Sequence, residues 1–236
     1  MDASTETCST QTTIDIVPDG DVVLAVGHQK QRLRVQSHIL KYASKVFAVM
    51  LSPAWQEGQV LLETKSLELP LEDDDPDAME IICRVIHHSN EPETEHPTPE
   101  MVLQLAVVAD KYNLTTALKF ASTCWLDRET DPDAVGSLSL LDQGRLMAAA
   151  HLLDNKHMFS KHSLSLSLNY AESYRTLLND RLIAQALPAE SIRRSHESLL
   201  HLYVNRRVYI NFCLTSHGGR TTIENEGCSH EHHGRR

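Results

Sequence analysis

The fold is decided by two consecutive stretches of the chain, Asp21-Val22-Val23-Leu24-Ala25-Val26-Gly27 and Leu33-Arg34-Val35-Gln36-Ser37-His38-Ile39-Leu40-Lys41-Tyr42-Ala43-Ser44-Lys45-Val46-Phe47-Ala48-Val49-Met50. The first stretch is an apolar run of strand length. In the second, Leu33 and Val35 alternate with polar residues, which is the period of a strand with one solvated face. After Ser37 the apolar residues recur every three or four positions, as in a helix. This order predicts a β-hairpin followed by two short helices.

Two serines mark the starts of these helices. Ser37 and Ser44 stand where a hydroxyl oxygen can accept hydrogen bonds from the unpaired N–H groups of a first helical turn. We expect Phe47 to lie in the hydrophobic core. The residues at helical spacing that predict the buried face of the pair are Ile39, Ala43, Val46, Phe47 and Met50.

A third strand and a well-defined helix follow. Residues 61–71 contain Leu67 and Leu69 in alternation with polar residues, which predicts a short strand, and the acidic run at 72–75 ends it. Asp75 is placed to cap the next helix, with Pro76 at its first position. One face of this helix is marked by four apolar residues at helical spacing, namely Met79, Ile82, Cys83 and Ile86.

The same capping pattern restarts a helix after a polar, proline-containing segment. Residues 89–97 are expected to form an exposed loop, and Thr98 with Pro99 begins the next helix, which runs toward Tyr112. We expect Thr115 or Thr116 to cap one more helix. Its inward residues would be Ala117, Leu118, Ala121, Cys124 and Trp125.

The chain divides into a mixed part and a helical part. Residues 1–18 have little periodicity and are expected to form a mobile N-terminal arm, and the mixed domain is expected to span residues 19–127. The charged, proline-containing segment 127–133 is the expected boundary. A helical extension over residues 133–214 would contain helices at 145–153, 156–169 and 188–214. The predicted class is therefore α+β, with a small three-stranded sheet, a cluster of helices and an all-α extension.

Composition and charge argue against several classes of protein. The chain has 32 acidic and 22 basic residues and a net charge of −10, which opposes the counterion release that drives nucleic-acid binding. No basic, then apolar, leader opens the chain, and no apolar run reaches about 18 residues, so we expect neither secretion nor a membrane span. The five cysteines form no CxxC pair, which favours reduced thiols in an intracellular protein of cytoplasm or nucleus; they are Cys8, Cys83, Cys124, Cys213 and Cys228.

No pattern of residues points to catalysis or to a cofactor. The glycines form neither GxxxxGK[ST] nor GxGxxG, and Asp73, Asp74 and Asp75 lack the alternating spacing of a calcium loop. His38 has no nucleophile or carboxylate placed beside it in a recognisable motif, so we expect it to bond to nearby backbone. We therefore expect no catalytic and no cofactor-binding residue, and an enzyme ranks last among the function classes.

A tail at residues 215–236 carries the strongest alternative function. Together with Cys213 it is rich in side chains that bind zinc, and a metal-responsive protein is the second hypothesis. The spacings do not reproduce the paired short spacings of structural zinc sites, so we favour a disordered, solvated tail and assign no metal ligand. The side chains concerned are Cys213, His217, Cys228, His230, His232 and His233.

Two separate motifs make residues 19–127 resemble a BTB/POZ domain. The first is an Asp-led strand followed by a second strand, a His before an Ile-Leu pair, and a Ser followed by an aromatic residue and a Met. The second is Val108-Ala109-Asp110-Lys111-Tyr112-Asn113-Leu114, which resembles the end of the fourth helix of that family. The residues that carry the resemblance are Asp21, His38, Ile39, Leu40, Ser44, Phe47, Met50, Ala109, Asp110, Lys111 and Tyr112.

The resemblance implies a protein that works through contacts with other proteins. BTB/POZ domains pair with themselves, and some attach to a cullin scaffold so that an adjoining domain presents a substrate for ubiquitin transfer. Self-association would use residues 37–50 and 21–26, and a cullin would meet the helices around 79–86 and 101–112. The candidate partner-binding residues are Met79, Ile82, Ile86, Met101, Leu103 and Tyr112.

Two departures from the family pattern bear on these uses. The segment before the Asp-led strand is too short and polar for the amphipathic helix of many self-pairing members. Cullin-recruiting members carry an apolar-x-acidic triplet before the Ala-Asp-Lys-Tyr motif, and the triplet here is Met101-Val102-Leu103, with Leu103 in place of the acid. Cullin recruitment therefore stays an open hypothesis.

The second half of the chain resembles the helical extension of fungal BTB-domain proteins. The resemblance rests on Ala148-Ala149-Ala150-His151-Leu152-Leu153-Asp154-Asn155-Lys156-His157-Met158-Phe159 and on residues 166–174. The function expected from the whole chain is a non-enzymatic interaction module, an adaptor that self-associates or links a partner to a cullin ubiquitin ligase. We expect protein partners, with no nucleic acid and no membrane among them.

Overall fold

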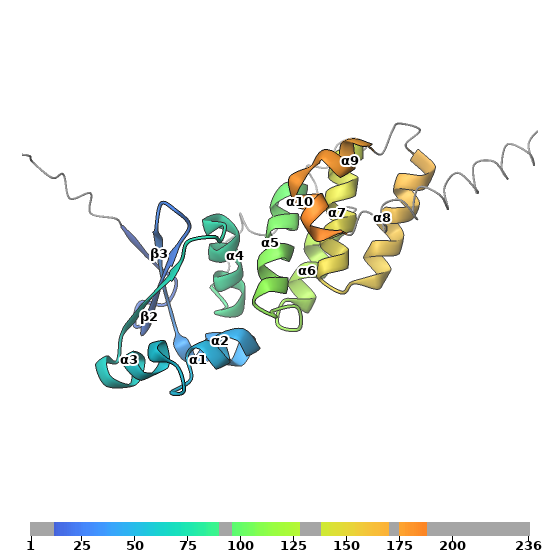
Figure 1. Ribbon diagram of the computed structural model, residues 1–236. Helices are drawn as coiled ribbons and strands as arrows, with labels where there is room; N and C mark the ends of the chain where they lie inside the picture. The colour runs from blue at the N-terminus through green and yellow to red at the C-terminus, as the bar shows by residue number, and fades with distance from the viewer. Residues whose placement is uncertain (1–11, 90–95, 128–137, 170–174, 188–236) are drawn as a thin grey trace, which may run out of the picture. The chain divides into compact units, whose positions relative to one another are not determined.

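The structure is a computed structural model that describes residues 12–89, 96–127, 138–169 and 175–187 (Figure 1). The predicted helix at 188–214 and the Cys/His-rich tail at 215–236 lie outside the described residues, and so do residues 1–11. Strands occur only in the first part of the described chain, and helices form the rest. The predicted α+β class with a helical continuation is confirmed.

A small mixed sheet holds the first part of the chain together. Its strand order is β1-β3-β2-β4. The predicted hairpin is confirmed as β2 (Val22–Val26) antiparallel to β3 (Gln31–Val35), with Leu24 opposite Leu33. The predicted third strand is β4 (Leu67–Leu71), which runs parallel to β2.

A fourth strand corrects the expected three-stranded sheet. β1 (Thr13–Asp15) runs parallel to β3, with Ile14 opposite Leu33, so the N-terminal arm expected over residues 1–18 is not unstructured along its whole length. The Arg34 Nε group donates to Asp15 Oδ1 over 2.7 Å, which ties the strand in place. Three residues are too few for a period-two pattern to be recognised in the sequence. The strand also forms only because β3 offers an open edge for pairing, and this edge exists only in the folded chain.

The two faces of the sheet have different chemistry. One face contributes the leucines and valines of β2, β3 and β4 to the core. The other carries ion pairs between strands, such as Arg32 Nη1 of β3 with Glu68 Oε1 of β4 at 2.7 Å, which reaches across the intervening β2. Val23 and Ala25 are buried on that face among the longer polar side chains of the adjacent strands.

Helices α1 (Ser37–Ala43) and α2 (Lys45–Met50) follow the hairpin as predicted. Ser44 caps α2, since its Oγ accepts from the Phe47 N–H at 3.0 Å. Ser37 does not cap α1 and lies inside it. Its N–H and its Oγ both donate to Asp21, each over 2.6 Å, so a carboxylate from the start of β2 caps α1.

Helix α3 (Gln56–Thr64) was not predicted, and it occupies the first residues of the stretch assigned to the third strand. Only Leu61 and Gly58 of this helix are buried, so the sequence shows no apolar stripe from which the helix could be predicted. A Cβ on Gly58 would lie 1.9 Å from the Ser52 carbonyl oxygen, so the helix start can pack closely on the preceding turn only with glycine there. Lys65 ends the helix in the left-handed region, at φ 60°.

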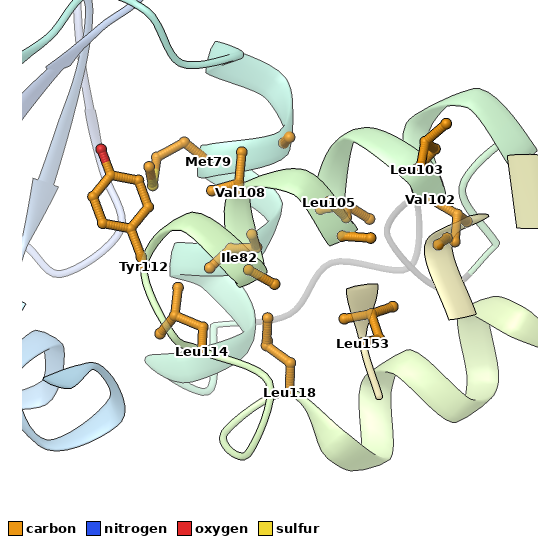
Figure 2. Close-up of a cluster of buried hydrophobic side chains, with 14 of the residues drawn as sticks. Met79, Ile82, Val102, Leu103, Leu105, Val108, Tyr112, Leu114, Leu118 and Leu153 are labelled. Atoms are coloured by element: carbon orange, nitrogen blue, oxygen red, sulfur yellow. The ribbon is translucent and has the colours of Figure 1, made fainter. Parts of the chain in front are cut away.

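Helices α4 (Pro76–Ile86) and α5 (Pro99–Lys111) begin as predicted. Asp75 Oδ1 accepts from the Ala78 N–H at 2.9 Å, and Thr98 Oγ1 accepts from the Met101 N–H at 3.2 Å. The predicted apolar face of α4 is buried. Figure 2 shows Met79 and Ile82 of α4 in one buried cluster with Leu105 and Val108 of α5.

Helix α6 (Lys119–Leu126) begins later than predicted. Neither Thr115 nor Thr116 caps it, because Leu118 holds the cap position and makes no side-chain bond there. Leu118 and Trp125 point inward as expected. Two of the other residues expected inside, Ala117 and Cys124, are exposed because the helix is short and presents one face to solvent.

The extension consists of α7 (Leu140–Leu152), α8 (Lys156–Asn169), α9 (Arg175–Asn179) and α10 (Arg181–Ala186). The bounds of α8 are those predicted. Helix α7 begins before residue 145 because Ser139 Oγ accepts from the Asp142 N–H at 3.1 Å. It packs against α5 as well as α8, so one hydrophobic core runs from the sheet into the extension.

Polar contacts also attach the extension to the first part of the chain. The buried His162 ring on α8 donates from Nε2 to the Leu126 carbonyl at 3.0 Å and accepts at Nδ1 from Gln143 Nε2 at 2.7 Å. Beside it, Lys161 Nζ pairs with Asp127 Oδ1 at 3.0 Å. No helix in the described ranges combines the length and hydropathy needed to cross a membrane.

Candidate interaction surface

Four residues of the sequence signature meet around one buried carboxylate. Asp74, in the loop before α4, accepts from the Tyr112 hydroxyl at Oδ2 over 2.5 Å and from Lys111 Nζ at Oδ1 over 2.7 Å. Burial, together with the hydrogen bond to Asp74 and its negative charge, raises the pKa of Tyr112 well above its usual range. The phenol therefore stays protonated and donates permanently.

The same tyrosine also connects to the first helices. Its ring stacks on Phe47 with the centroids 4.6 Å apart and the planes parallel. Its carbonyl oxygen accepts from Ser44 Oγ at 2.5 Å. Ser44, Phe47, Lys111 and Tyr112 thus form one structural cluster with Asp74, and none of them offers a reactive group to a substrate.

The histidine at the strand–helix junction is His87, whereas the sequence pointed to His38. His38 is exposed. His87, at the end of α4, accepts at Nε2 from the Gln36 N–H at 3.1 Å and donates from Nδ1 to the Cys83 carbonyl at 2.8 Å. Burial lowers the pKa of His87, and the N–H pointing at Nε2 also requires the neutral ring.

The remaining signature residues hold the fold or lie at its surface. Leu40 and Ala109 are fully buried, Met50 is half-buried and Asp110 is exposed. Cys83 is also buried, and that burial, with a smaller contribution from Glu80, raises the pKa of its thiol to about 12, so it is a poor nucleophile.

The candidate partner-binding residues need correction because most of them form the core. Met79, Ile82, Ile86, Leu103 and Tyr112 are buried, and only Met101 is partly exposed. Apolar residues at helical spacing mark the inner face of a helix, and that face is the one a partner cannot reach. Strand β2, assigned to self-association, is likewise interior, since β3 and β4 pair with both of its edges.

An accessible groove lies elsewhere, between helices α1 and α2, the end of α4 and the turn that follows α5. Its volume is about 880 Å³. Ile39, Ala43 and Ala48 supply apolar surface from α1 and α2, and Val85 and Ile86 supply it from α4. The apolar part of the lining is larger than the polar part, as is common in grooves that bind peptides or small ligands.

The rim of this groove carries an exposed tyrosine and basic side chains. Tyr42 is 92% exposed, the most exposed of the large hydrophobic residues in the described ranges. The groove is also lined by Lys41, Lys45, His38 and His88, and no aspartate or glutamate from the described ranges lines it. A tyrosine with its ring in water and its neighbours apolar is a favourable anchor for a protein contact.

A second groove of about 770 Å³ has the opposite charge. It lies beside the start of α4 and is lined by Glu72, Asp73, Asp74, Asp75 and Asp77, with Arg181 from α10. Asp74 and Asp75 are already used by Tyr112, Lys111 and the cap of α4. Within the described ranges, no group of three or more His, Cys, Asp or Glu side chains is placed to hold a metal ion.

The zinc hypothesis falls outside the described residues. Its side chains, Cys213 and the five tail residues named above, have no described position. The described cysteines are the buried Cys83 and the exposed Cys124, both free thiols.

The sequence assigned residues 37–50 to self-association, and this range contains the α1 and α2 part of the groove lining. The groove itself was not predicted because its other parts are far apart in the chain. Lys41, Tyr42 and Lys45 look like ordinary solvated helix positions, and His88 and Asn113 join them only in the folded molecule. One local signal was available. Tyr42 is a large aromatic residue on the polar side of the helical pattern that places Ala43 and Phe47 on the buried side.

Comparison with known proteins agrees with the fold. Residues 19–123 match the family model described as BTB/POZ domain. No curated protein matches the chain at a significant level. The match supports a protein–protein interaction module, which is what BTB/POZ domains are.

Proposed function

We propose that the BTB/POZ-like part of this chain binds a segment of another protein in the groove between α1, α2 and the end of α4. The observation that carries the proposal is the exposed Tyr42 beside an open, mainly apolar groove. The signature cluster around Asp74 supports the same reading, since it fixes α2 to the end of α5 and thereby holds two walls of the groove in place.

The energetics fit a contact with few anchors. A buried tyrosine at the centre of an interface commonly accounts for about 2 kcal/mol or more of binding free energy. Tyr42 loses water from almost its whole side chain if a partner covers it, whereas Phe47, one turn later, is already buried. We therefore expect Tyr42→Ala to weaken partner binding by about thirtyfold.

Affinity purification followed by quantitative mass spectrometry tests this function. The full wild-type chain is compared with Tyr42→Ala and with Phe120→Ala, which removes an equally exposed aromatic ring from α6, outside the groove lining. A set of partners kept by wild type and Phe120→Ala but lost by Tyr42→Ala is the expected result. The same set on all three proteins would contradict the proposal.

Light scattering distinguishes a different partner from a second copy of the chain. Wild type and Tyr42→Ala are measured at the same concentrations. A dimer that dissociates in the variant would mean that the groove serves self-association. A wild-type monomer that still retains its partners would favour an adaptor that binds a different protein.

Cullin recruitment is the more specific form of the adaptor role. Met101 is the candidate residue that stays accessible for it, at the start of α5, while α7 and α10 pack against the same helix. A pull-down with a cullin amino-terminal domain, using wild type and Met101→Asp, tests this form. If the wild-type chain does not retain the cullin, the cullin role is contradicted, and the proposal for the groove is not affected.

A further inference from the structure

We propose that the groove beside Tyr42 selects an acidic partner segment that also carries aliphatic side chains. This inference rests on the proposed function, because it names the chemistry of the partner for the same groove. It is carried by the charges that line the groove, by their lack of described counter-charges and by the apolar floor between them.

The charges of the groove have one sign. Lys41 lies on α1 and Lys45 opens α2, and the imidazoles of His38 and His88 lie on the same lining. Among the described residues, no carboxylate contributes to the lining. The chain as a whole has a net charge of −10, so a groove whose described lining carries lysines and no carboxylate runs against the average composition of the protein.

Lys41 and Lys45 lack the carboxylate partners that several arginines of the fold have. Arg32, Arg34 and Arg145 each lie within ion-pair distance of a carboxylate. Across the described residues, no carboxylate comes within 4.0 Å of Lys41 or Lys45. A partner with glutamates or aspartates would supply these counter-charges, which speeds association and excludes basic competitors.

The floor of the groove adds a second requirement. Ala43, Ala48 and Val85 present small apolar surfaces, and the volume of about 880 Å³ exceeds what one side chain fills. Aliphatic side chains of a peptide would bury there, while its carboxylates reach the lysines at the rim. A nucleic acid would satisfy the lysines but would leave the apolar floor unused, so a peptide is the better match.

Fluorescence anisotropy with three labelled synthetic peptides of equal length tests the inference on the full chain. The first alternates leucine and glutamate, the second replaces each glutamate by lysine, and the third replaces each leucine by serine. We expect the leucine–glutamate peptide to bind at least about tenfold more tightly than either of the others. Raising the salt concentration should weaken it, since screening shortens the reach of the rim charges.

Charge reversal provides the matched control. Lys41→Glu with Lys45→Glu should weaken the leucine–glutamate peptide at least about tenfold. Lys119→Glu with Lys156→Glu makes the same change in net charge at two exposed residues that open other helices, outside the groove lining, and should change the affinity less than about twofold. Circular dichroism confirms that both double variants fold.

The outcomes separate this inference from the proposed function. Equal or tighter binding of the lysine peptide, or equal effects of the two double variants, would overturn the acidic preference. If Tyr42→Ala still loses its natural partners in that case, the groove keeps its function with a different partner chemistry. Tighter binding of a single-stranded oligonucleotide than of the leucine–glutamate peptide would also overturn the inference.

Discussion

Two groups of polar residues next to helix α2 differ in whether their partners lie within the fold. In the first group, both carboxylate oxygens of Asp74 accept hydrogen bonds within the fold, one from Tyr112 and one from Lys111. Around Tyr42, the lysines face an open groove and have no described carboxylate at ion-pair distance. The difference teaches that Ser44, Phe47, Lys111 and Tyr112 of the signature serve the scaffold, while Tyr42 and the two groove lysines, on which the proposed contact depends, lie outside the signature.

The largest expected effect breaks the closed cluster at its apolar centre. Phe47 is fully buried against Tyr112, so Phe47→Asp would place an unpaired carboxylate in the core and should destabilise the fold by about 4 kcal/mol or more. Val49→Asp, on the same helix at 56% exposure, is the matched control and should cost less than about 0.5 kcal/mol. Urea denaturation measures both. Similar midpoints would show that Phe47 does not lie in the core.

A smaller change removes one hydrogen bond and leaves the aromatic packing. Tyr112→Phe deletes the donor to the buried Asp74 and should cost about 2 kcal/mol, the range for a bond to a charged acceptor. Tyr42→Phe deletes a hydroxyl from a solvated ring and should have no measurable effect on stability. If Tyr112→Phe loses no more stability than Tyr42→Phe, the hydrogen bond from Tyr112 to Asp74 adds nothing to the free energy of unfolding.

Mildly acidic pH should destabilise the fold through His87, which accepts a hydrogen bond at the junction between strand β3 and α1. Its pKa is lowered in the folded state, so the unfolded chain takes up a proton first and stability falls as the pH drops below about 6.5, the usual value for histidine. Thermal melts from neutral to mildly acidic pH measure this fall. His87→Gln should remove the part of the slope that His87 causes, whereas His38→Gln, on an exposed ring, should leave it unchanged.

The smallest expected effect concerns the solvated face of the sheet. Arg32 of β3 and Glu68 of β4 pair at 2.7 Å across the intervening β2, but both side chains are partly exposed. A double-mutant cycle with Arg32→Gln and Glu68→Gln should give a coupling below about 1 kcal/mol that salt reduces. A coupling free energy as large as the loss of stability in Tyr112→Phe would mean that buried and solvated polar contacts contribute equally to the stability of this fold.

The elements that could be predicted are those whose signals are local. Helix α4 has a capping Asp75, a proline at its first position and four apolar residues on one face, and all of these are found as expected. Ser44 is likewise readable as a cap because its partner, the Phe47 N–H, is three residues away. Patterns of this kind need no knowledge of the rest of the fold.

The elements that could not be predicted depend on distant contacts. β1 exists because β3 offers an edge, and α1 is capped by Asp21, sixteen residues earlier in the chain. The groove itself combines α1 with the end of α4 and with Asn113, so no window of sequence contains it. Most of the candidate partner-binding residues are buried for a related reason, since apolar periodicity indicates the inner face of a helix, whereas Tyr42 lies off that pattern.

Helix α7 has a consequence for how this chain can be divided or altered. Three consecutive alanines, Ala148, Ala149 and Ala150, are fully buried in it, and a side chain at Gly144 would meet Leu177 at 2.4 Å. The alanines take up little space in a helix that packs against both α5 and α8, and Gly144 leaves room for Leu177 of α9. A protein shortened at the end of α6 would expose the apolar surface of α5 that α7 covers, and we expect it to aggregate. A larger side chain at any of the three alanines would push the neighbouring helices apart.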